Sequence, residues 1–184
     1  AKMAKVLKLV NEEKIWTKES AKLKNQIQTQ FWDAKTGWFY DTSIDGKNFI
    51  KDMGCEGFLP LWAEVASVEQ AKSIKNNLLN PDTFNTFVPL PTLAANQPKF
   101  KPDNGYWRGP IWLDQSYFSI NGLEKYGYQN EANQLAHKLI HNAEGALKKG
   151  KSIRENYNPI TGKGLEGENF SWSAAHYLML LLKN

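Results

Sequence analysis

A carboxylate, Glu155, lies in a stretch of residue types that suit sugar chemistry. Arg154 precedes it, Tyr157 follows two positions later, and an aromatic pair, Phe170 and Trp172, comes after a loop rich in proline and glycine. Sugars stack their apolar faces on aromatic rings, and a carboxylate kept ionised by a nearby cation can act as a general base on water. An exposed loop glutamate without a chemical role is the alternative, and on the residues alone it is favoured.

A second cluster of candidate residues lies where a helix is expected to begin. Trp107 and Trp112 could stack on sugar rings, and Arg108, Asp114 and Gln115 could bind hydroxyl groups. The alternative is a helix N-terminus with core aromatics and a surface Arg–Asp pair, because tryptophan is as useful in a core as in a binding site. For Trp112 the two interpretations have equal weight.

The chain offers little for a metal or a redox site. His137 and His141 are one helical turn apart, but no third ligand accompanies them. Cys55 is the only cysteine, so neither an intrachain disulfide framework nor a cluster of zinc-binding thiolates can form. We therefore expect no metal and no cofactor in this chain.

Composition argues against two classes of partner. The 184 residues suit one domain and carry a net charge of +4, with lysines spread along the expected helices rather than gathered in a patch. Arginine, which reads phosphates and bases, occurs only at Arg108 and Arg154, so we expect no nucleic-acid binding. No apolar run has the length of a membrane span, and the basic start at Ala1 lacks an apolar signal core. These features leave the compartment undetermined.

Expected helices of two kinds alternate along the chain. Helices that are apolar nearly all round are expected at 58–66, 109–126 and 171–182. Helices with one apolar stripe are expected at 12–32, 68–79 and 130–149, after a short helix at 1–10. Asn11 and Ser67 are the expected caps of the first two striped helices. Inner and outer layers of paired helices explain the alternation.

The segments between these helices are expected to crowd one end of the assembly. A hairpin is expected around Asp45-Gly46, a long irregular segment covers 80–106, and the loop that carries Glu155 covers 152–170. Each of them falls just before an inner helix. The pattern fits an all-α helical toroid with a cleft at one end, although three inner helices are too few to close the ring.

Several motifs in this order resemble a known family of enzymes. The segment Glu-Asn-Tyr-Asn-Pro-Ile-Thr-Gly-Lys-Gly at 155–164, with Phe-Ser-Trp-Ser-Ala-Ala at 170–175, resembles the C-terminal signature of glycoside hydrolase family 63. Tyr-Trp-Arg-Gly-Pro-Ile-Trp at 106–112 is similar to the other diagnostic stretch of that family, and 57–62 and 88–94 resemble further segments of it. The resemblance covers roughly the whole chain, and the nearest relatives look like bacterial α-glucosidases.

The resemblance implies an all-α (α/α)6 toroid, with residues 1–184 as the C-terminal half of its catalytic domain and short β-hairpins in the loops at the cleft end. It implies an inverting glycosidase in which Glu155 aligns with the general base, while the aspartic acid that serves as general acid lies upstream of this chain. The two carboxyl groups of inverting enzymes stand roughly 6.5–9.5 Å apart, which leaves room for the attacking water. The implied sugar-binding residues are Trp107, Arg108, Trp112, Asp114, Gln115, Tyr157, Phe170 and Trp172.

The implied activity is inverting hydrolysis of α-glucosidic bonds in oligosaccharides, completed by the N-terminal part of the same protein or by a second chain. The isolated chain is then expected to be inactive, and a structural calcium on the missing half stays open. Bacterial relatives would place the protein in the periplasm or the cytoplasm. Because Asp114-Gln115 differs from the Asn-containing version of some relatives, specificity like that of trehalases or mannosylglycerate hydrolases also stays open.

Two other functions fit the same residues. One is a non-catalytic carbohydrate-binding helical domain, in which Glu155 binds a sugar hydroxyl instead of activating water. The other is a sugar epimerase or isomerase on the same toroid, for which His176 is the candidate base because it lies on the last apolar helix.

Overall fold

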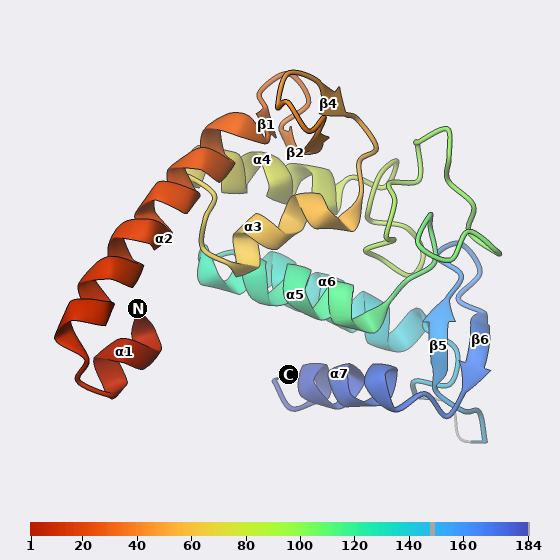
Figure 1. Ribbon diagram of the computed structural model, residues 1–184. Helices are drawn as coiled ribbons and strands as arrows, with labels where there is room; N and C mark the ends of the chain where they lie inside the picture. The colour runs from red at the N-terminus through yellow and green to blue at the C-terminus, as the bar shows by residue number, and fades with distance from the viewer. Residues whose placement is uncertain (148–149, 184) are drawn as a thin grey trace.

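The chain folds into helices joined by long loops and short hairpins, as a computed structural model shows for residues 1–147 and 150–183 (Figure 1). The helices in this part of the chain are α1 (Lys2–Val6), α2 (Val10–Gln30), α3 (Leu59–Trp62), α4 (Val68–Leu79), α5 (Leu113–Lys125), α6 (Gln129–Asn142) and α7 (Ser171–Leu181). A 3-10 helix, η1 (Cys55–Phe58), leads directly into α3.

Three antiparallel hairpins of two strands each accompany these helices in the described ranges. They pair β1 (Trp32–Asp33) with β2 (Trp38–Phe39), β3 (Asp41–Thr42) with β4 (Phe49–Ile50), and β5 (Arg154–Tyr157) with β6 (Gly164–Glu168). The predicted turn at Asp45-Gly46 is confirmed, since it joins β3 to β4. The positions of the first and third hairpins were not predicted, because strands of two to five residues give almost no periodic signal.

α5 lies at the centre of the body, where it packs against α3, α6 and α7 (Figure 1). Its buried residues include Leu113, Ile120 and Leu123, which join one continuous apolar core with the buried stripe of α6. That stripe repeats at helical spacing, as predicted, and consists of Ala132, Leu135, Ala136, Leu139 and Ile140. The predicted contrast between apolar inner helices and striped outer helices therefore holds around α5 and α6.

α4 begins and ends where the sequence predicted. The Ser67 hydroxyl accepts a hydrogen bond from the Gln70 N–H at 3.2 Å, and the Gln70 side chain accepts one from the Ser67 N–H at 2.8 Å. This capping box satisfies two amide groups at the helix start that have no partner inside the helix. The buried face of α4 carries Ala71, Ile74 and Leu78, as predicted.

Four predicted helix boundaries were wrong, and the backbone explains each. Asn11 lies inside α2, because the break is made by Lys8, whose φ is 58°. The helix predicted at 58–66 ends at Trp62, shortly before Glu64 takes a φ of 57°. α5 starts at Leu113 and not at 109, because Trp112 is still extended.

The fourth difference concerns α6, which was predicted to continue to 149. It ends at Asn142, because the next residue, Ala143, is extended with a ψ of 125°. Leu147, which falls inside the predicted one-striped helix at 130–149, is exposed. The predicted helix end at Lys149 lies outside the described residues.

Two helices leave apolar side chains uncovered. α2 projects away from the body, and its Trp16 and Leu23 are exposed (Figure 1). Ile27, near the C-terminal end of α2 that meets the body, is half-buried. α7 likewise buries Tyr177 and Leu180 but exposes a second apolar face, formed by Leu178, Met179, Leu181 and the following Leu182. A helix that is apolar on both faces is normally covered on both.

The long irregular segment and the β5–β6 hairpin gather at one end of the body (Figure 1). Their backbones are joined there, because Ile111 and Tyr157 exchange two amide hydrogen bonds, of 2.7 and 3.1 Å. The side chain of Thr92 ties the segment together by accepting from the Gly109 N–H at 3.1 Å and donating to the Pro110 carbonyl at 3.0 Å. This end of the body holds both clusters of candidate residues.

In the part of the chain that the structure describes, no helix is long and apolar enough to cross a membrane.

Candidate active site

Glu155 lies on strand β5, in a segment that the sequence predicted to be a loop. The pairing of β5 with β6 shifts register here, since Arg154 pairs with Glu168 but Asn156 pairs with Leu165. Two residues of β6 therefore face Glu155 alone, and the first of them, Glu166, has a φ of 54°. Such β-bulges are frequent beside active sites, where they redirect a side chain or a backbone group.

The bulge brings a backbone donor to the carboxylate. The Gly167 N–H donates to Glu155 Oε2 at 3.3 Å. A Cβ at Gly167 would lie only 3.2 Å from the same oxygen, so the absence of a side chain allows this approach. From the other side, the Ser173 hydroxyl of α7 donates to the Glu155 carbonyl at 2.8 Å and ties the strand to that helix.

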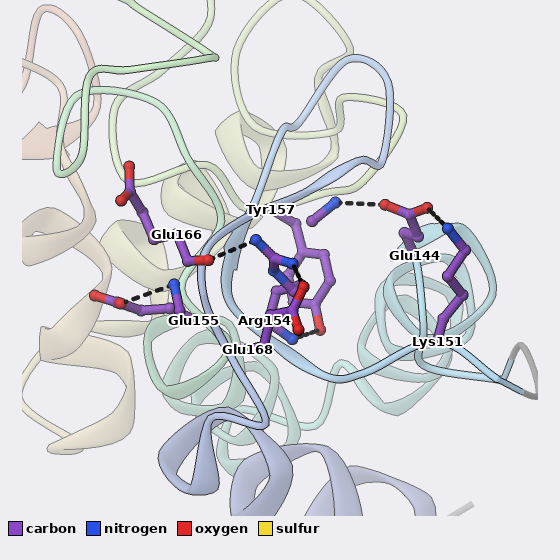
Figure 2. A network of polar contacts seen from close by, with 9 residues as sticks. Glu144, Lys151, Arg154, Glu155, Tyr157, Glu166 and Glu168 are labelled. Carbon is purple, nitrogen blue, oxygen red and sulfur yellow. Dashed lines mark hydrogen bonds and ion pairs between the residues drawn. The ribbon is translucent and has the colours of Figure 1, made fainter.

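Arg154 does not support the Glu155 carboxylate, contrary to the prediction. Its guanidinium donates to Glu168 Oε1 and to the Glu166 carbonyl, each at 2.5 Å (Figure 2). Figure 2 shows the Glu155 side chain extending away from this group. Neighbouring residues on a strand point to opposite faces, so an adjacent cation in the sequence need not be adjacent in space.

The side-chain donor to Glu155 is instead Tyr106, which the sequence did not single out as a site residue. Its hydroxyl donates to Glu155 Oε1 at 2.9 Å across 49 positions of sequence. This hydrogen bond raises the pKa of Tyr106, because loss of the phenol proton would place a second negative charge beside the carboxylate. The position of Tyr106 next to Trp107 and Arg108 was the feature of the sequence that could have identified it as a site residue.

Aromatic rings form a continuous platform next to this pair of residues. Trp107 stacks on Trp112 with ring centroids 4.2 Å apart and planes 8° from parallel. Trp172, on α7, has its ring centroid 5.4 Å from that of Trp112. Phe170 continues the row, 6.1 Å from Trp172, and Tyr106 meets Trp112 edge-on at 5.0 Å. Trp107 and Trp172 are 42% and 43% exposed, whereas Trp112 is 2% exposed. Of these three tryptophans, Trp107 and Trp172 therefore offer ring surface to a ligand and Trp112 does not.

The remaining members of the second cluster divide between the surface and the interior. Arg108 is exposed and, with Trp107, lines a cavity of about 320 Å³. The other walls of that cavity include Asp52, Glu56, Thr92 and Lys99, so charged, hydroxyl and aromatic groups all face it.

Asp114 and Gln115 occupy the first turn of α5. Asp114 is buried, and its Oδ2 accepts from the Gln115 side-chain amide at 2.8 Å. Its Oδ1 has no hydrogen-bond partner within the described part of the chain. A buried carboxylate oxygen without a partner is costly, so this side chain has unused capacity to accept a hydrogen bond.

Tyr157, which was predicted to bind sugar, offers no exposed surface in this structure. Its side chain is fully buried in the core, and its hydroxyl accepts a hydrogen bond from the Arg154 N–H at 3.0 Å. Tyr157 instead fixes the geometry of β5 from within. The end of strand β5 enters the core, where Asn156 and Tyr157 are both buried and the Tyr157 backbone pairs with that of the buried Ile111.

The histidines and the cysteine are arranged without a metal site in the described ranges, where no group of three or more suitable side chains comes together. His137 and His141 stack with ring centroids 3.8 Å apart. His176 lies beside Tyr117 at 5.5 Å, and its Nδ1 is 3.0 Å from the Trp172 carbonyl. Desolvation raises the pKa of the Cys55 thiol to about 12, which keeps it protonated.

Comparison with known proteins gives consistent results. A family model for the mannosylglycerate hydrolase MGH1-like glycoside hydrolase domain matches residues 1–173. Mannosylglycerate hydrolase MGH1 of Selaginella moellendorffii is 30% identical over 97% of this chain and 38% of its own length. Mannosylglycerate hydrolase of Rubrobacter radiotolerans is 29% identical over 85% of this chain and 35% of its own length. This chain thus spans little more than a third of the length of these two curated relatives.

Solved structures agree with the sequence relatives. The glycoside hydrolase family 63 (GH63) mannosylglycerate hydrolase of Thermus thermophilus, in complex with glucose, superposes with a TM-score of 0.69 at 27% identity, over 84% of this chain and 37% of that one. Neutral trehalase Nth1 of Saccharomyces cerevisiae superposes with a TM-score of 0.71 at 25% identity, over 91% of this chain and 30% of that one. The chain therefore belongs to the MGH1-like glycoside hydrolases, and the predicted resemblance to glycoside hydrolase family 63 is confirmed.

Proposed function

We propose that this chain supplies the general base and part of the sugar-binding surface of an inverting glycoside hydrolase. The observation that carries the proposal is the position of Glu155. Its carboxylate is held at both oxygens, by Tyr106 and by Gly167, beside a platform of exposed aromatic rings. A fixed carboxylate next to rings on which a sugar can stack is the arrangement that water activation at an anomeric carbon requires.

The fold that we propose is the C-terminal half of an (α/α)6 toroid. Two observations support it: the apolar faces of α2 and α7 are uncovered, and the chain spans little more than a third of its curated relatives. The remaining part would cover both faces, as the N-terminal part of the same protein or as a second chain. It would also carry the general acid, an aspartic acid placed roughly 6.5–9.5 Å from Glu155 so that a water fits between them.

Sugar binding is assigned to the exposed groups around Glu155. Trp107 and Trp172 would stack on sugar rings, with Phe170 extending the platform. Arg108 and the cavity of about 320 Å³ beside it would bind hydroxyl groups of the substrate. The carboxylate of Asp114, whose Oδ1 lacks a partner in the described ranges, and the amide of Gln115 could serve the same purpose from the start of α5 once the rest of the site is present.

The substrate is an α-linked glycoside, and three specificities compete. The sequence motifs favour glucose-terminated oligosaccharides, and one matched relative is the mannosyl-oligosaccharide glucosidase of Saccharomyces cerevisiae, at 26% identity. The matched relatives with the higher identities, and the structure from Thermus thermophilus, are mannosylglycerate hydrolases, which favours a short glycoside with a small aglycone. Trehalase-like specificity is supported by the likeness to neutral trehalase.

The test is a matched pair of glutamate substitutions on one hairpin, made in a protein that includes the whole catalytic domain. Glu155→Gln keeps the side-chain shape and removes the base, so kcat should fall by roughly 10²–10⁴-fold while sugar binding is retained. Glu168→Gln is the control, because Glu168 lies on the same hairpin but is paired with Arg154. Mannosylglycerate, trehalose and a glucose-terminated oligosaccharide would be compared as substrates.

Proton NMR of the sugar released from the preferred substrate would show whether the anomeric configuration inverts. Full turnover by the Glu155→Gln variant would contradict the assignment of the base. Release of the retained anomer would contradict the inverting mechanism. Binding of the sugars without hydrolysis by the complete protein would favour the non-catalytic carbohydrate-binding alternative.

A further inference from the structure

We propose that Tyr106 is a positioning residue for Glu155, and that Trp112 holds Tyr106 in place through its indole N–H. Two successive hydrogen bonds would then aim the carboxylate. The inference rests on the proposed function for its catalytic meaning, but the two bonds themselves can be tested without any reaction. Trp112 takes a positioning role in this arrangement and not the sugar-stacking role that the sequence left open.

The first bond joins Tyr106 to the base. The Tyr106 hydroxyl donates to Glu155 Oε1 at 2.9 Å, and the Gly167 N–H donates to Glu155 Oε2 at 3.3 Å. A carboxylate has about four lone-pair sites. Each oxygen therefore keeps one site free, and an attacking water could use it while the two donors fix the plane of the group.

The second bond fixes the backbone of Tyr106. The Trp112 Nε1–H donates to the Tyr106 carbonyl at 3.0 Å. Tyr106 has a φ of 58°, which is unfavourable for a residue with a Cβ and persists only where the surroundings impose it. The buried indole of Trp112, in contact with both Trp107 and Trp172, is well placed to impose it.

Backbone strain is found on both sides of the carboxylate. Tyr106, which donates to one oxygen, has a positive φ, and so does Glu166, which precedes the Gly167 N–H that donates to the other. Residues in such conformations cluster at sites where a group must be held in one geometry. Because Tyr106 also meets Trp107 and Trp112 edge-on, at 6.2 and 5.0 Å, the platform and the base are joined through one side chain.

The first experiment measures the bond directly in the 184-residue chain. Tyrosine labelled with ¹³C at Cζ would be titrated by NMR, and the Tyr106→Phe variant would assign the Tyr106 signal. The charged groups that face Tyr106 are Glu155, through the hydrogen bond, and Glu166, through its charge alone. We expect Tyr106 to titrate above the ordinary tyrosine pKa of about 10 and to return close to it in the Glu155→Gln variant.

Two further variants separate the hydrogen bonds from general effects of charge and packing. Glu166→Gln removes a charge without removing the bond, so it should lower the pKa of Tyr106 much less than Glu155→Gln does. Trp112→Phe keeps an aromatic ring but removes the indole donor, so the Tyr106 signal should shift in the same direction as in Glu155→Gln. A Tyr106 titration that is identical in Glu155→Gln and in the parent would overturn the proposal, and one unchanged by Trp112→Phe would overturn the part assigned to Trp112.

The second experiment gives the bonds their catalytic meaning in the complete domain. Tyr106→Phe should lower kcat by roughly 10- to 100-fold and leave KM within about threefold, because misplacing a reacting group costs rate more than ground-state binding. Unchanged kcat, or a loss confined to KM, would overturn the positioning role. If the complete domain hydrolyses none of the glycosides, the proposed function fails, and the titration alone then decides whether the two bonds hold Glu155.

Discussion

The uncovered face of α7 gives a direct test of whether this chain packs against a further part of a catalytic domain. Leu178 and Leu180 lie on opposite sides of the helix and differ in burial, since Leu178 is 55% exposed and Leu180 is fully buried. Replacing each by alanine compares an uncovered position with a core position in the same helix. Alanine favours helix formation, so neither change should harm the helix itself.

The expected magnitudes follow from the burial of the two side chains. Full burial of a leucine contributes roughly 1.5–3 kcal/mol, so a side chain that is about half exposed has roughly 0.8–1.5 kcal/mol still to gain. Leu178→Ala should therefore lower the free energy of unfolding of the isolated chain by less than about 1 kcal/mol. In a protein that includes the rest of the domain the same change should cost about 2–4 kcal/mol, because it leaves a cavity at a buried contact.

Urea unfolding of both proteins, with each leucine variant beside its parent, measures these differences. Leu180→Ala is the control and should cost about 2–5 kcal/mol in the isolated chain and in the complete protein alike. The reasoning would be refuted if Leu178→Ala cost the same small amount in both proteins, because the exposed face of α7 would then remain uncovered in the complete molecule.

Two further predictions concern groups outside the site. Because desolvation raises the pKa of the Cys55 thiol to about 12, the thiolate fraction at pH 8 is on the order of 10⁻⁴. Iodoacetamide, followed by mass spectrometry, should therefore label the native chain far more slowly than the urea-unfolded chain. Rapid labelling of the native chain would contradict the structure. The hydrogen bond from Lys51 lowers the pKa of Asp33, so this bond stabilises the fold above the unfolded pKa of about 3.9 and loses its contribution as pH falls through the folded pKa. The difference in melting temperature between Lys51→Met and the parent should therefore be larger at pH 7 than at pH 2.5. An equal difference at both pH values would contradict this assignment.

The sequence was most informative where local chemistry decides local structure. The capping box at Ser67, the buried stripe of α6 at Ala132, Leu135 and Leu139, and the turn at Asp45-Gly46 depend on residues a few positions apart, and each was predicted correctly. The ends of α3 and α6 were misplaced, since each depends on backbone angles set by packing. The β5–β6 hairpin was missed because two short strands around a turn resemble a loop when only residue types are known.

The family and the identity of the candidate base were contained in the sequence, because both rest on residue types in a fixed order. Which groups hold the Glu155 carboxylate in place was decided only by the tertiary structure. Arg154, the neighbour in sequence, points away to Glu168, while Tyr106 reaches Glu155 from 49 positions earlier. Packing of the end of β5 into the core likewise buries Tyr157, which the motif had assigned to the sugar. A linear sequence records which residues are near one another along the chain, whereas hydrogen bonds act between groups that only the folded chain brings within about 3 Å.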